Sequence, residues 1–539
     1  MRERVSAAVV AVSLTAVLAP PAIASLIVLF GVNVAIQDQI AIGEFLVRNH
    51  GRPFPAIGDL FAQHNESRKV FPRLIFFYLA KLTHWNVRYE MGLAWLMACG
   101  IAGGVWLLAR RSIADRTIAI AATAVAVLLV FSPVQWWNWL YGIQIVVFFP
   151  MLTLVVALLA VQGAMTLPQR AVVAAICCFV ATYSYANGMI LWLLVLPALL
   201  ARREDRKPAV IIPWIVAAAI SIGLYFVGYQ KPVVSPPMTS PFARPVDIAS
   251  FVAAFIGHPL ASTDSLPANA LLGALALAMF VLLAFRAGRA GLPWVLIGAY
   301  SIVSAATTAV GRLGLGPQTA VEPRYTTFAI SIWISIVMFA AIAMPRGRAL
   351  AAVALLLLHG LAIAAAWPQI RECYRDRLIA RAATQLCAVL PDRSLLARLI
   401  ERDPSHAIWV LTSLAKIGYV NPAPLSSGTV MQGIAAGGTR GAFEGVLLTP
   451  GQPLLYGWAL MPDGRAADAV VIARSEPDGD HPVALSERTV FRPDRPGFGW
   501  DLRARRSLAI PGSVYTAWAY DTSARRAYRL AGSLAITKR

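Results

Sequence analysis

Long apolar segments alternate with short polar ones over the first two thirds of the chain. A helix that crosses the hydrocarbon core of a bilayer needs about 17 to 25 apolar residues. Eleven apolar windows of about that length occur before residue 368. The first extends to Ile36 and contains Pro20-Pro21, which predicts a break or kink. We therefore predict an α-helical polytopic membrane domain over residues 1–367, with about eleven transmembrane helices. The remaining windows lie near 90–109, 117–132, 143–163, 171–186, 188–201, 209–229, 268–285, 292–310, 326–344 and 349–367.

The N-terminal segment has a second interpretation. Met1 to Arg4, followed by an apolar run, is also how a cleaved signal peptide begins, and small residues of the right type stand at Ala22 to Ser25. The apolar character continues from Leu26 to Ile36, however. This continuation favours a retained first helix.

The basic residues predict the orientation, because many stand in short runs between the apolar windows. Counted from a cytoplasmic Arg2 and Arg4, these runs all fall on one side, as the positive-inside rule requires. The same count places four longer segments and everything after Trp367 on the opposite, extracytoplasmic face. The runs are Arg110-Arg111 with Arg116, Arg202-Arg203 with Arg206-Lys207, Arg286 with Arg289, and Arg346 with Arg348; the external segments are Gln37 to Glu90, Ser132 to Gly142, Gln230 to Pro267 and Gly311 to Arg324.

The pattern changes after the last window. Residues 368–427 carry a charged stretch, Arg371 to Lys416, with apolar spacing near 3.6, which predicts an external helical linker. Residues 428–539 show short alternating runs separated by turns such as Pro-Asp-Gly and Asp-Gly-Asp, which predict an all-β sandwich domain. The clearest predicted strands are Phe443 to Leu448, Leu454 to Leu460, Ala469 to Ala473 and Tyr515 to Tyr520.

Composition supports the membrane class, since 58% of the residues are hydrophobic, 14% are charged and the mean hydropathy is +0.65. The net charge of +20 does not indicate nucleic-acid binding, because the basic residues form no face of a soluble domain. Five cysteines add little. Cys373 and Cys387 lie in the external region, where a disulfide between them is one alternative. If one continuous helix joins them, it holds them roughly 20 Å apart, which is too far for a disulfide.

The first external segment, residues 37–90, has the most informative chemistry. Asp38 follows the first helix, and Gln63-His64-Asn65-Glu66-Ser67-Arg68-Lys69 brings an acid, a histidine and two cations together. Such groups suit a reaction that needs a base and a clamp for an anion. The alternative is a solvated loop with one or two helix caps. The apolar stretch Val70 to Leu82 predicts a helix lying on or dipping into the membrane interface.

Other polar and aromatic groups lie near the predicted membrane surface. Trp136, Trp137, Trp139 and Tyr141 are typical of an aromatic belt, with stacking on a sugar as the alternative. Asn138 and Asn187 either line a cavity or form hydrogen bonds between helices. The chain has no Walker loop, no His-Glu-x-x-His and no Gly-x-Ser-x-Gly.

The arrangement resembles the GT-C superfamily of glycosyltransferases, which use polyprenyl-phosphate sugars and carry an acid just after the first helix in a large first external loop. Four segments of this chain also resemble segments of large bacterial multi-pass membrane proteins. The resemblance covers roughly residues 1 to 370. It implies a bacterial inner-membrane enzyme with a periplasmic C-terminal region, a polyprenyl-phosphate-sugar donor and a glycan, lipid or protein acceptor in the cell envelope. The segments concerned are His64 to Arg68, Trp137 to Trp139, Tyr183 to Gly188 and Arg324 to Thr327.

The resemblance also implies roles for residues. Asp38 matches the first-loop acid, as a base or as a ligand of Mg²⁺ or Mn²⁺, and Glu66 would be a second acid. The chain departs from the family in having no paired acid at this point, because Gln37 and Gln39 flank Asp38. The remaining expected roles are phosphate contacts from Arg68, Lys69, Arg312 and Arg324, and a substrate cavity lined by His64, Asn65, Asn138, Asn187 and Tyr325.

Two other functions remain open at this point. A flippase or transporter of lipid-linked sugars would need a polar path at the membrane midplane and alternating access. A polymerase or ligase of surface polysaccharide would use the same external face with different residues.

Overall fold

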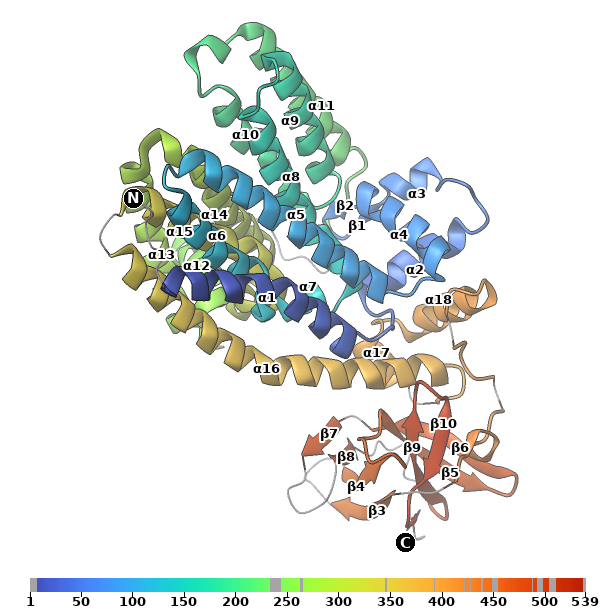
Figure 1. The fold of residues 1–539 in the computed structure, drawn as a ribbon. Helices are drawn as coiled ribbons and strands as arrows, with labels where there is room; N and C mark the ends of the chain where they lie inside the picture. The colour runs from blue at the N-terminus through green and yellow to red at the C-terminus, as the bar shows by residue number, and fades with distance from the viewer. Residues whose placement is uncertain are drawn as a thin grey trace. The chain divides into compact units, whose positions relative to one another are not determined.

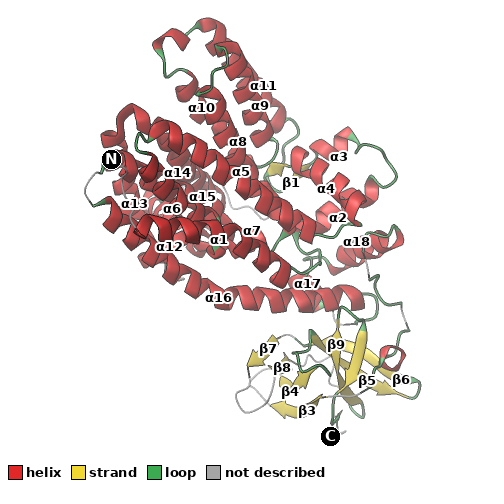
Figure 2. Ribbon diagram, viewed as in Figure 1, coloured by secondary structure: helices red, strands yellow, loops and turns green. Residues whose placement is uncertain are grey.

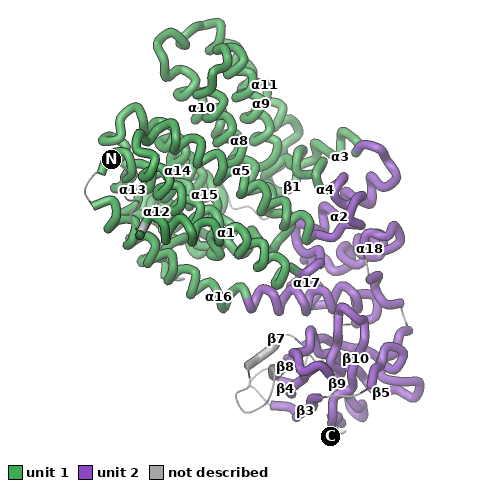
Figure 3. Tube along the Cα trace, in the orientation of Figure 1, with its two compact units in different colours: residues 1–31, 55–76, 88–370 green, residues 32–54, 77–87, 371–539 purple. Residues whose placement is uncertain are grey.

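The computed structural model describes most of the chain. The residues outside it are 1–6, 233–243, 262–264, 345–346, 392, 421, 427, 438–439, 448–453, 487, 492–497, 504–509 and 537–539. The described part is mostly helical, with strands gathered toward the C-terminus (Figures 1 and 2). It divides into two compact units, coloured separately in Figure 3. The first contains Met1–Gly31, Pro55–Phe76 and Arg88–Ile370, and the second contains Val32–Phe54, Phe77–Val87 and Arg371–Arg539.

The predicted apolar windows all coincide with helices. In the part of the chain that the structure describes, eight helical stretches are long and apolar enough to cross a membrane, and the stretch Leu266–Leu315 contains two helices, α13 and α14. Three shorter apolar helices, α9, α10 and α12, accompany them. The length and apolar composition of these helices indicate a multi-pass membrane protein. The helices that match the windows are α1 (Ala7–Phe30), α5 (Arg88–Ser112), α6 (Arg116–Val130), α8 (Ile145–Val161), α9 (Leu167–Thr182), α10 (Leu191–Leu199), α11 (Pro208–Phe226), α13 (Leu266–Ala287), α14 (Leu292–Arg312), α15 (Thr326–Ala343) and α16 (Arg348–Leu386).

Two details of these helices differ from the sequence prediction. Helix α1 continues through Pro20-Pro21 and ends at Phe30 rather than near Ile36. Helix α16 continues through Pro368 to Leu386, so the last apolar window and the start of the charged linker form one helix. The predicted helical stretch up to Lys416 then continues as two short helices, α17 (Ser394–Leu399) and α18 (Pro404–Lys416).

One apolar helix was not expected. Helix α12 (Pro245–Ala261) lies within the segment predicted to be polar and external, Gln230 to Pro267. It packs closely on α13, because a Cβ atom on Gly273 would come within 1.7 Å of the Ala253 carbonyl oxygen. At 17 residues, with Asp247 in its first turn and His258 near its end, α12 is shorter and less uniformly apolar than the windows that reveal the other helices.

The first external segment folds into short elements. They are α2 (Asp38–Arg48), α3 (Ile57–Phe61), the hairpin strands β1 (Gln63–His64) and β2 (Ser67–Arg68), and α4 (Val70–Thr83), which confirms the helix expected at Val70 to Leu82. Short helical turns also occupy the other connections. They are η1 (Pro133–Gln135), α7 (Trp136–Trp139), η2 (Gly142–Gln144), η3 (Ala186–Ile190), η4 (Arg203–Asp205), η5 (Gly288–Gly291), η6 (Leu313–Leu315), η7 (Pro317–Val321) and η8 (Pro323–Tyr325).

The C-terminal part of the second unit contains two antiparallel sheets. One has the strand order β10-β9-β5-β6, with β11 also paired to β9, and the other has the order β3-β4-β8-β7. Phe443 and Trp500 of the second sheet share one hydrophobic core with Ile472 and Ala517 of the first. The strands are β3 (Arg440–Leu447), β4 (Leu454–Leu460), β5 (Ala469–Glu476), β6 (Gly479–Leu485), β7 (Arg488–Phe491), β8 (Phe498–Arg503), β9 (Val514–Asp521), β10 (Arg526–Arg529) and β11 (Leu534–Ala535).

Cys373 and Cys387 do not form a disulfide. Cys373 lies in α16 and Cys387 just beyond its end, and all five cysteines are free thiols. Burial raises the pKa of the Cys387 thiol to about 11. It is therefore a packed side chain and not a reactive thiolate.

A buried carboxylate in this β region predicts acid sensitivity. The Asp480 carboxylate accepts hydrogen bonds from Ser475 (2.7 Å), Thr516 (2.8 Å) and Trp518 (3.2 Å). Burial alone would raise the pKa of Asp480, but these bonds and the charge of Arg529 outweigh it, so the pKa is lowered. A carboxyl whose pKa is lower in the folded state stabilises the fold above its unfolded pKa, which is near 4.

We expect this stabilisation to disappear as the pH falls from about 4 through the lower pKa of folded Asp480. Hydrogen exchange of the β5 and β9 amides in the full-length protein, corrected for the intrinsic effect of pH on exchange, measures this change. Asp480→Asn should lower protection at neutral pH and flatten the acid dependence. An unchanged acid dependence in the variant would assign it to other carboxyls.

Candidate functional site

A tight hairpin in the first unit presents Glu66. Strands β1 and β2 pair with Gln63 opposite Arg68, which leaves Asn65 and Glu66 as the two turn residues. Asn65 has a φ of 51°, a left-handed conformation that asparagine adopts more readily than most residues. The hydroxyl of Tyr225 donates to the Glu66 carbonyl oxygen at 2.6 Å, so the turn is fixed to the end of α11.

Arg68 of the same hairpin forms hydrogen bonds to neighbouring segments. Its guanidinium donates to the carbonyl oxygens of Tyr225 (2.6 Å), Phe61 and Val227. The side chain is buried, and these contacts occupy all three guanidinium nitrogens. Arg68 therefore braces the hairpin, and its expected phosphate contact stays a prediction. Lys69 and His64 are buried beside it.

The Glu66 carboxylate pairs with Arg312, the last residue of α14. The distance between the Arg312 Nη2 atom and a Glu66 carboxylate oxygen is 2.9 Å. Both side chains remain accessible, with exposed fractions of 31% for Glu66 and 22% for Arg312. The pair therefore orients the carboxylate without removing it from solvent.

A second ion pair comes from the turn before α15. The Arg324 Nε atom lies 2.5 Å from a Glu322 carboxylate oxygen, and its guanidinium lies over the ring of Tyr325 at 5.0 Å. Tyr325 in turn stacks on Phe255 of α12, with ring centroids 5.4 Å apart. The missed helix α12 thus supports the turn that carries Arg324.

Tyr185 connects the two ion pairs. It lies in the loop between α9 and η3, and the backbone N–H of its neighbour Ala186 donates to the Ser67 hydroxyl of the hairpin at 3.2 Å. Burial raises the pKa of Tyr185, nearby Tyr325 raises it further, and the charges of Arg324 and Arg312 lower it. Glu66 is also close enough to act on this hydroxyl. Tyr185 is therefore a protonated hydroxyl at neutral pH, able to donate a hydrogen bond.

We call this group the acid–arginine cluster. Its members come from the hairpin, the α9–η3 loop, the end of α14 and the turn before α15, and all belong to the first unit. Two carboxylates balance two guanidinium groups, and two phenol hydroxyls complete the cluster. Its residues are Glu66, Tyr185, Arg312, Glu322, Arg324 and Tyr325.

The two asparagines expected to line a cavity form hydrogen bonds between segments instead. The Asn138 amide donates to the Arg324 carbonyl oxygen (3.1 Å) and to Thr327 (2.8 Å), so it positions the Arg324 turn. Asn187 accepts from Thr307 of α14 at 3.3 Å. Of the two interpretations of these amides, hydrogen bonding between helices is the one that the structure supports.

Two of the tryptophans near Asn138 are buried in the first unit. Trp139 is fully buried and donates to the Ser132 carbonyl oxygen at 2.9 Å. Trp136 is also buried and donates to Gln369 at 3.1 Å. Belt residues face the lipid headgroups, so these two side chains belong to the packing of α7 instead.

Asp38 belongs to the second unit. It is the first residue of α2, is exposed, and follows Gln37, whose φ is 45°. Its expected role as a base stays a prediction. Among the described residues, ligand atoms suited to a metal gather at Glu476, Asp478 and His481 in the β region, and Asp38 is in no such group. The described residues around Asp38 therefore give no support for the expected Mg²⁺ or Mn²⁺.

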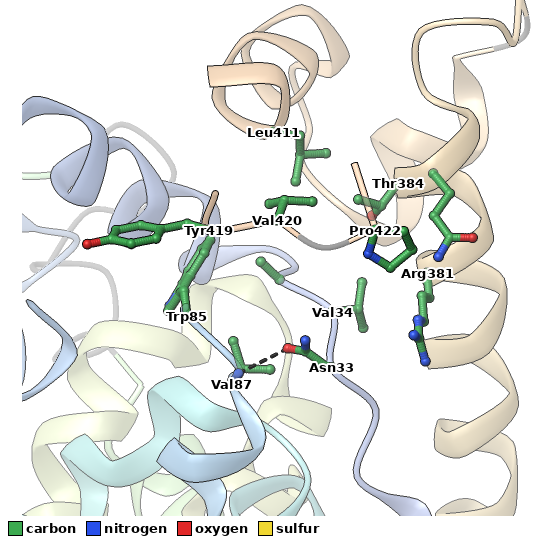
Figure 4. A pocket seen from close by; sticks show the side chains of 12 residues that line it. Asn33, Val34, Trp85, Val87, Arg381, Thr384, Leu411, Tyr419, Val420 and Pro422 are labelled. Carbon is green, nitrogen blue, oxygen red and sulfur yellow. Dashed lines mark hydrogen bonds between the residues drawn. The ribbon is translucent and has the colours of Figure 1, made fainter. Parts of the chain in front are cut away.

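A small pocket lies in the second unit (Figure 4). Residues such as Trp85, Arg381 and Tyr419 line it, and Asn33 accepts a hydrogen bond from the Val87 N–H at 3.0 Å. Its cavity volume of about 40 Å³ has room for only a few water molecules.

Comparison with known proteins finds no match among family models, curated proteins or solved structures. The sequence prediction named Glu66, Arg312, Arg324 and Tyr325 of this cluster, and it missed Tyr185 and Glu322 as site residues. The available signal was the alternation of charge in Glu322-Pro323-Arg324, directly before an apolar helix.

Proposed function

We propose that the chain is a membrane glycosyltransferase of GT-C type that takes a sugar from a polyprenyl-phosphate donor at the acid–arginine cluster. One observation carries the proposal: an accessible carboxylate, Glu66, stands with two guanidinium groups, Arg312 and Arg324, where apolar helices end. A lipid anchor would lie among such helices while its phosphate meets the arginines. The acceptor would be a glycan, lipid or protein of the cell envelope.

In the proposed reaction an acceptor hydroxyl attacks the anomeric carbon of the donor sugar. The new C–O bond forms as the bond between that carbon and the phosphate oxygen breaks, and the polyprenyl phosphate leaves with the electron pair. Glu66 takes the proton of the acceptor hydroxyl, and Arg324 stabilises the charge that develops on the phosphate. Arg312 orients Glu66 through their ion pair, and the Tyr185 hydroxyl donates a further hydrogen bond to the phosphate.

The proposal includes the topology predicted from the sequence. Eleven crossings, with a cytoplasmic N-terminus, place the turn residues of the hairpin, the end of α14 and the start of α15 on the external face, which in a bacterial inner membrane is the periplasmic face. The shared core of the two C-terminal sheets supports a β-sandwich. A neutral cluster of two acids and two arginines favours a phosphodiester, with its single negative charge.

The test is transfer by the purified protein in lipid vesicles that contain synthetic polyprenyl-phosphate sugars. We expect release of free polyprenyl phosphate, and Arg324→Ala should reduce kcat/KM by roughly 10²- to 10³-fold, as the loss of one stabilising donor does in other enzymes. Arg324→Lys should recover only part of this, because lysine cannot make the forked contact.

Two results would contradict the proposal. One is movement of a labelled lipid-linked sugar across the vesicle membrane with no bond cleavage, which would indicate a flippase. The other is full transfer activity in Arg324→Ala. Arg88→Ala is the matched control, since Arg88 is an accessible arginine of the same unit that contacts the Val28 carbonyl oxygen and stands outside the cluster.

A further inference from the structure

Strand β4 presents two aromatic side chains on the outer face of its sheet. Leu455 and Ala459 belong to the hydrophobic core shared by the two sheets. Because side chains alternate along a strand, Tyr456 and Trp458 point to the opposite face. Both are partly exposed, and neither ring makes an aromatic contact with another described residue. We call these two residues the aromatic pair.

The neighbours of the aromatic pair are small. Trp458 lies opposite Ala442 of β3 and Gly499 of β8, and residues directly opposite share a face of the sheet. Because its two cross-strand partners are an alanine and a glycine, no large side chain directly flanks the indole ring of Trp458.

The cross-strand partners of Tyr456 include a charged residue. Its two partners are Gly445 of β3 and Asp501 of β8. Gly445 has a φ of 154°, and a Cβ atom there would lie 3.8 Å from the Tyr456 hydroxyl oxygen, so the phenol ring extends along the glycine. Arg503, two residues beyond Asp501 on the same face of β8, is exposed. Charged groups thus stand at one end of a flat aromatic surface.

We infer that this face of the β region binds a glycan built from pyranose sugars. The C–H bonds on one side of a pyranose ring are attracted to the electron-rich face of an aromatic ring. Two rings on alternate residues of a strand are about 7 Å apart, which allows contact with neighbouring sugars of one chain. Asp501 and Arg503 supply an acceptor and donors for the sugar hydroxyls.

A glycan fits this surface better than a protein partner does. A protein interface has a continuous apolar core, often of several hundred Å². Here the two rings are flanked by glycine, alanine and an aspartate, and Leu447 and Leu454 form the next row beside the exposed Arg503. Aromatic platforms edged by hydrogen-bonding groups match the alternating polar and C–H faces of sugars.

The experiment measures binding by the full-length protein in lipid nanodiscs, which avoids detergents with sugar headgroups. The probes are soluble hexasaccharides of glucose, mannose and N-acetylglucosamine, followed by saturation-transfer NMR. We expect at least one of them to bind, and Trp458→Ala to weaken it by roughly tenfold or more through loss of stacking. Trp458→Phe should retain much of the binding, because it keeps a ring at the same place.

Trp409→Ala is the matched control, since Trp409 is an exposed tryptophan on α18, outside the sheets, and should not matter. Unchanged thermal unfolding of Trp458→Phe and Tyr456→Phe shows that the sheet is intact. Absence of binding to every hexasaccharide, or equal binding by wild type and Trp458→Ala, would overturn the inference. Glycan binding does not depend on the proposed transfer, so Arg324→Ala should bind like wild type.

Discussion

Glu66→Gln should reduce sugar transfer by roughly 10²- to 10⁴-fold, the usual contribution of a general base. Glutamine keeps the shape of the side chain and its hydrogen bond with Arg312, but its amide oxygen cannot take the proton of the acceptor hydroxyl. We therefore expect kcat to fall while binding of the lipid donor changes little. Steady-state transfer in lipid vesicles, at saturating donor, measures this effect.

The controls separate catalysis from folding. The Glu66–Arg312 pair is partly exposed, so its loss should cost no more than about 1 kcal/mol of stability. Glu44→Gln is the matched variant, because Glu44 also pairs with an arginine, Arg48, but stands outside the cluster. Asp38→Asn tests the alternative base. Full activity in Glu66→Gln together with loss of activity in Asp38→Asn would move the catalytic assignment to Asp38.

Arg68→Ala should be the most destabilising single change in the hairpin region. The substitution leaves three carbonyl oxygens, those of Phe61, Tyr225 and Val227, without their charged donor. Each buried group that loses its partner costs about 1 to 3 kcal/mol, so we expect a total loss of about 3 to 5 kcal/mol. The thermal midpoint of the purified protein measures the loss.

The comparison variant is Arg48→Ala, because Arg48 is 58% exposed and its ion pair is with its helix neighbour Glu44. It should change stability by less than about 0.5 kcal/mol. Arg68→Lys should recover part of the loss, since one ammonium group cannot reach three carbonyl oxygens as a fork does. If Arg68→Ala left the midpoint unchanged but abolished phosphate binding, the bracing role would be wrong.

The apolar pattern was sufficient to predict most of the helices. It could not predict which segments distant in the sequence contact one another. Each window from the first to 349–367 became a helix because a long apolar run has no other stable form in lipid. Helix α12 was not predicted because its 17 residues carry an acid, Asp247, in the first turn and a histidine, His258, in the last turn. Strands β4 and β9 were predicted from their alternation, whereas β6 contains Pro482, which weakens the strand signal.

The candidate site was predicted only in part. Charge and position in the external segments indicated Glu66, Arg312 and Arg324. Arg312 and Arg324 follow Glu66 by 246 and 258 residues in the sequence, yet all three side chains influence the pKa of Tyr185. Nothing in the sequence distinguished Arg68, which binds backbone carbonyls, from Arg312, which binds a carboxylate. That difference depends on where the end of α11 lies, and only the fold determines it.

The most direct test of the central claim is an experimental structure of the protein in nanodiscs with a polyprenyl phosphate added. The account predicts that the phosphate lies within about 4 Å of the Arg324 guanidinium, at the acid–arginine cluster, with the lipid chain among the apolar helices. A phosphate bound elsewhere, with Glu66–Arg312 and Glu322–Arg324 unchanged and out of its reach, would contradict the account.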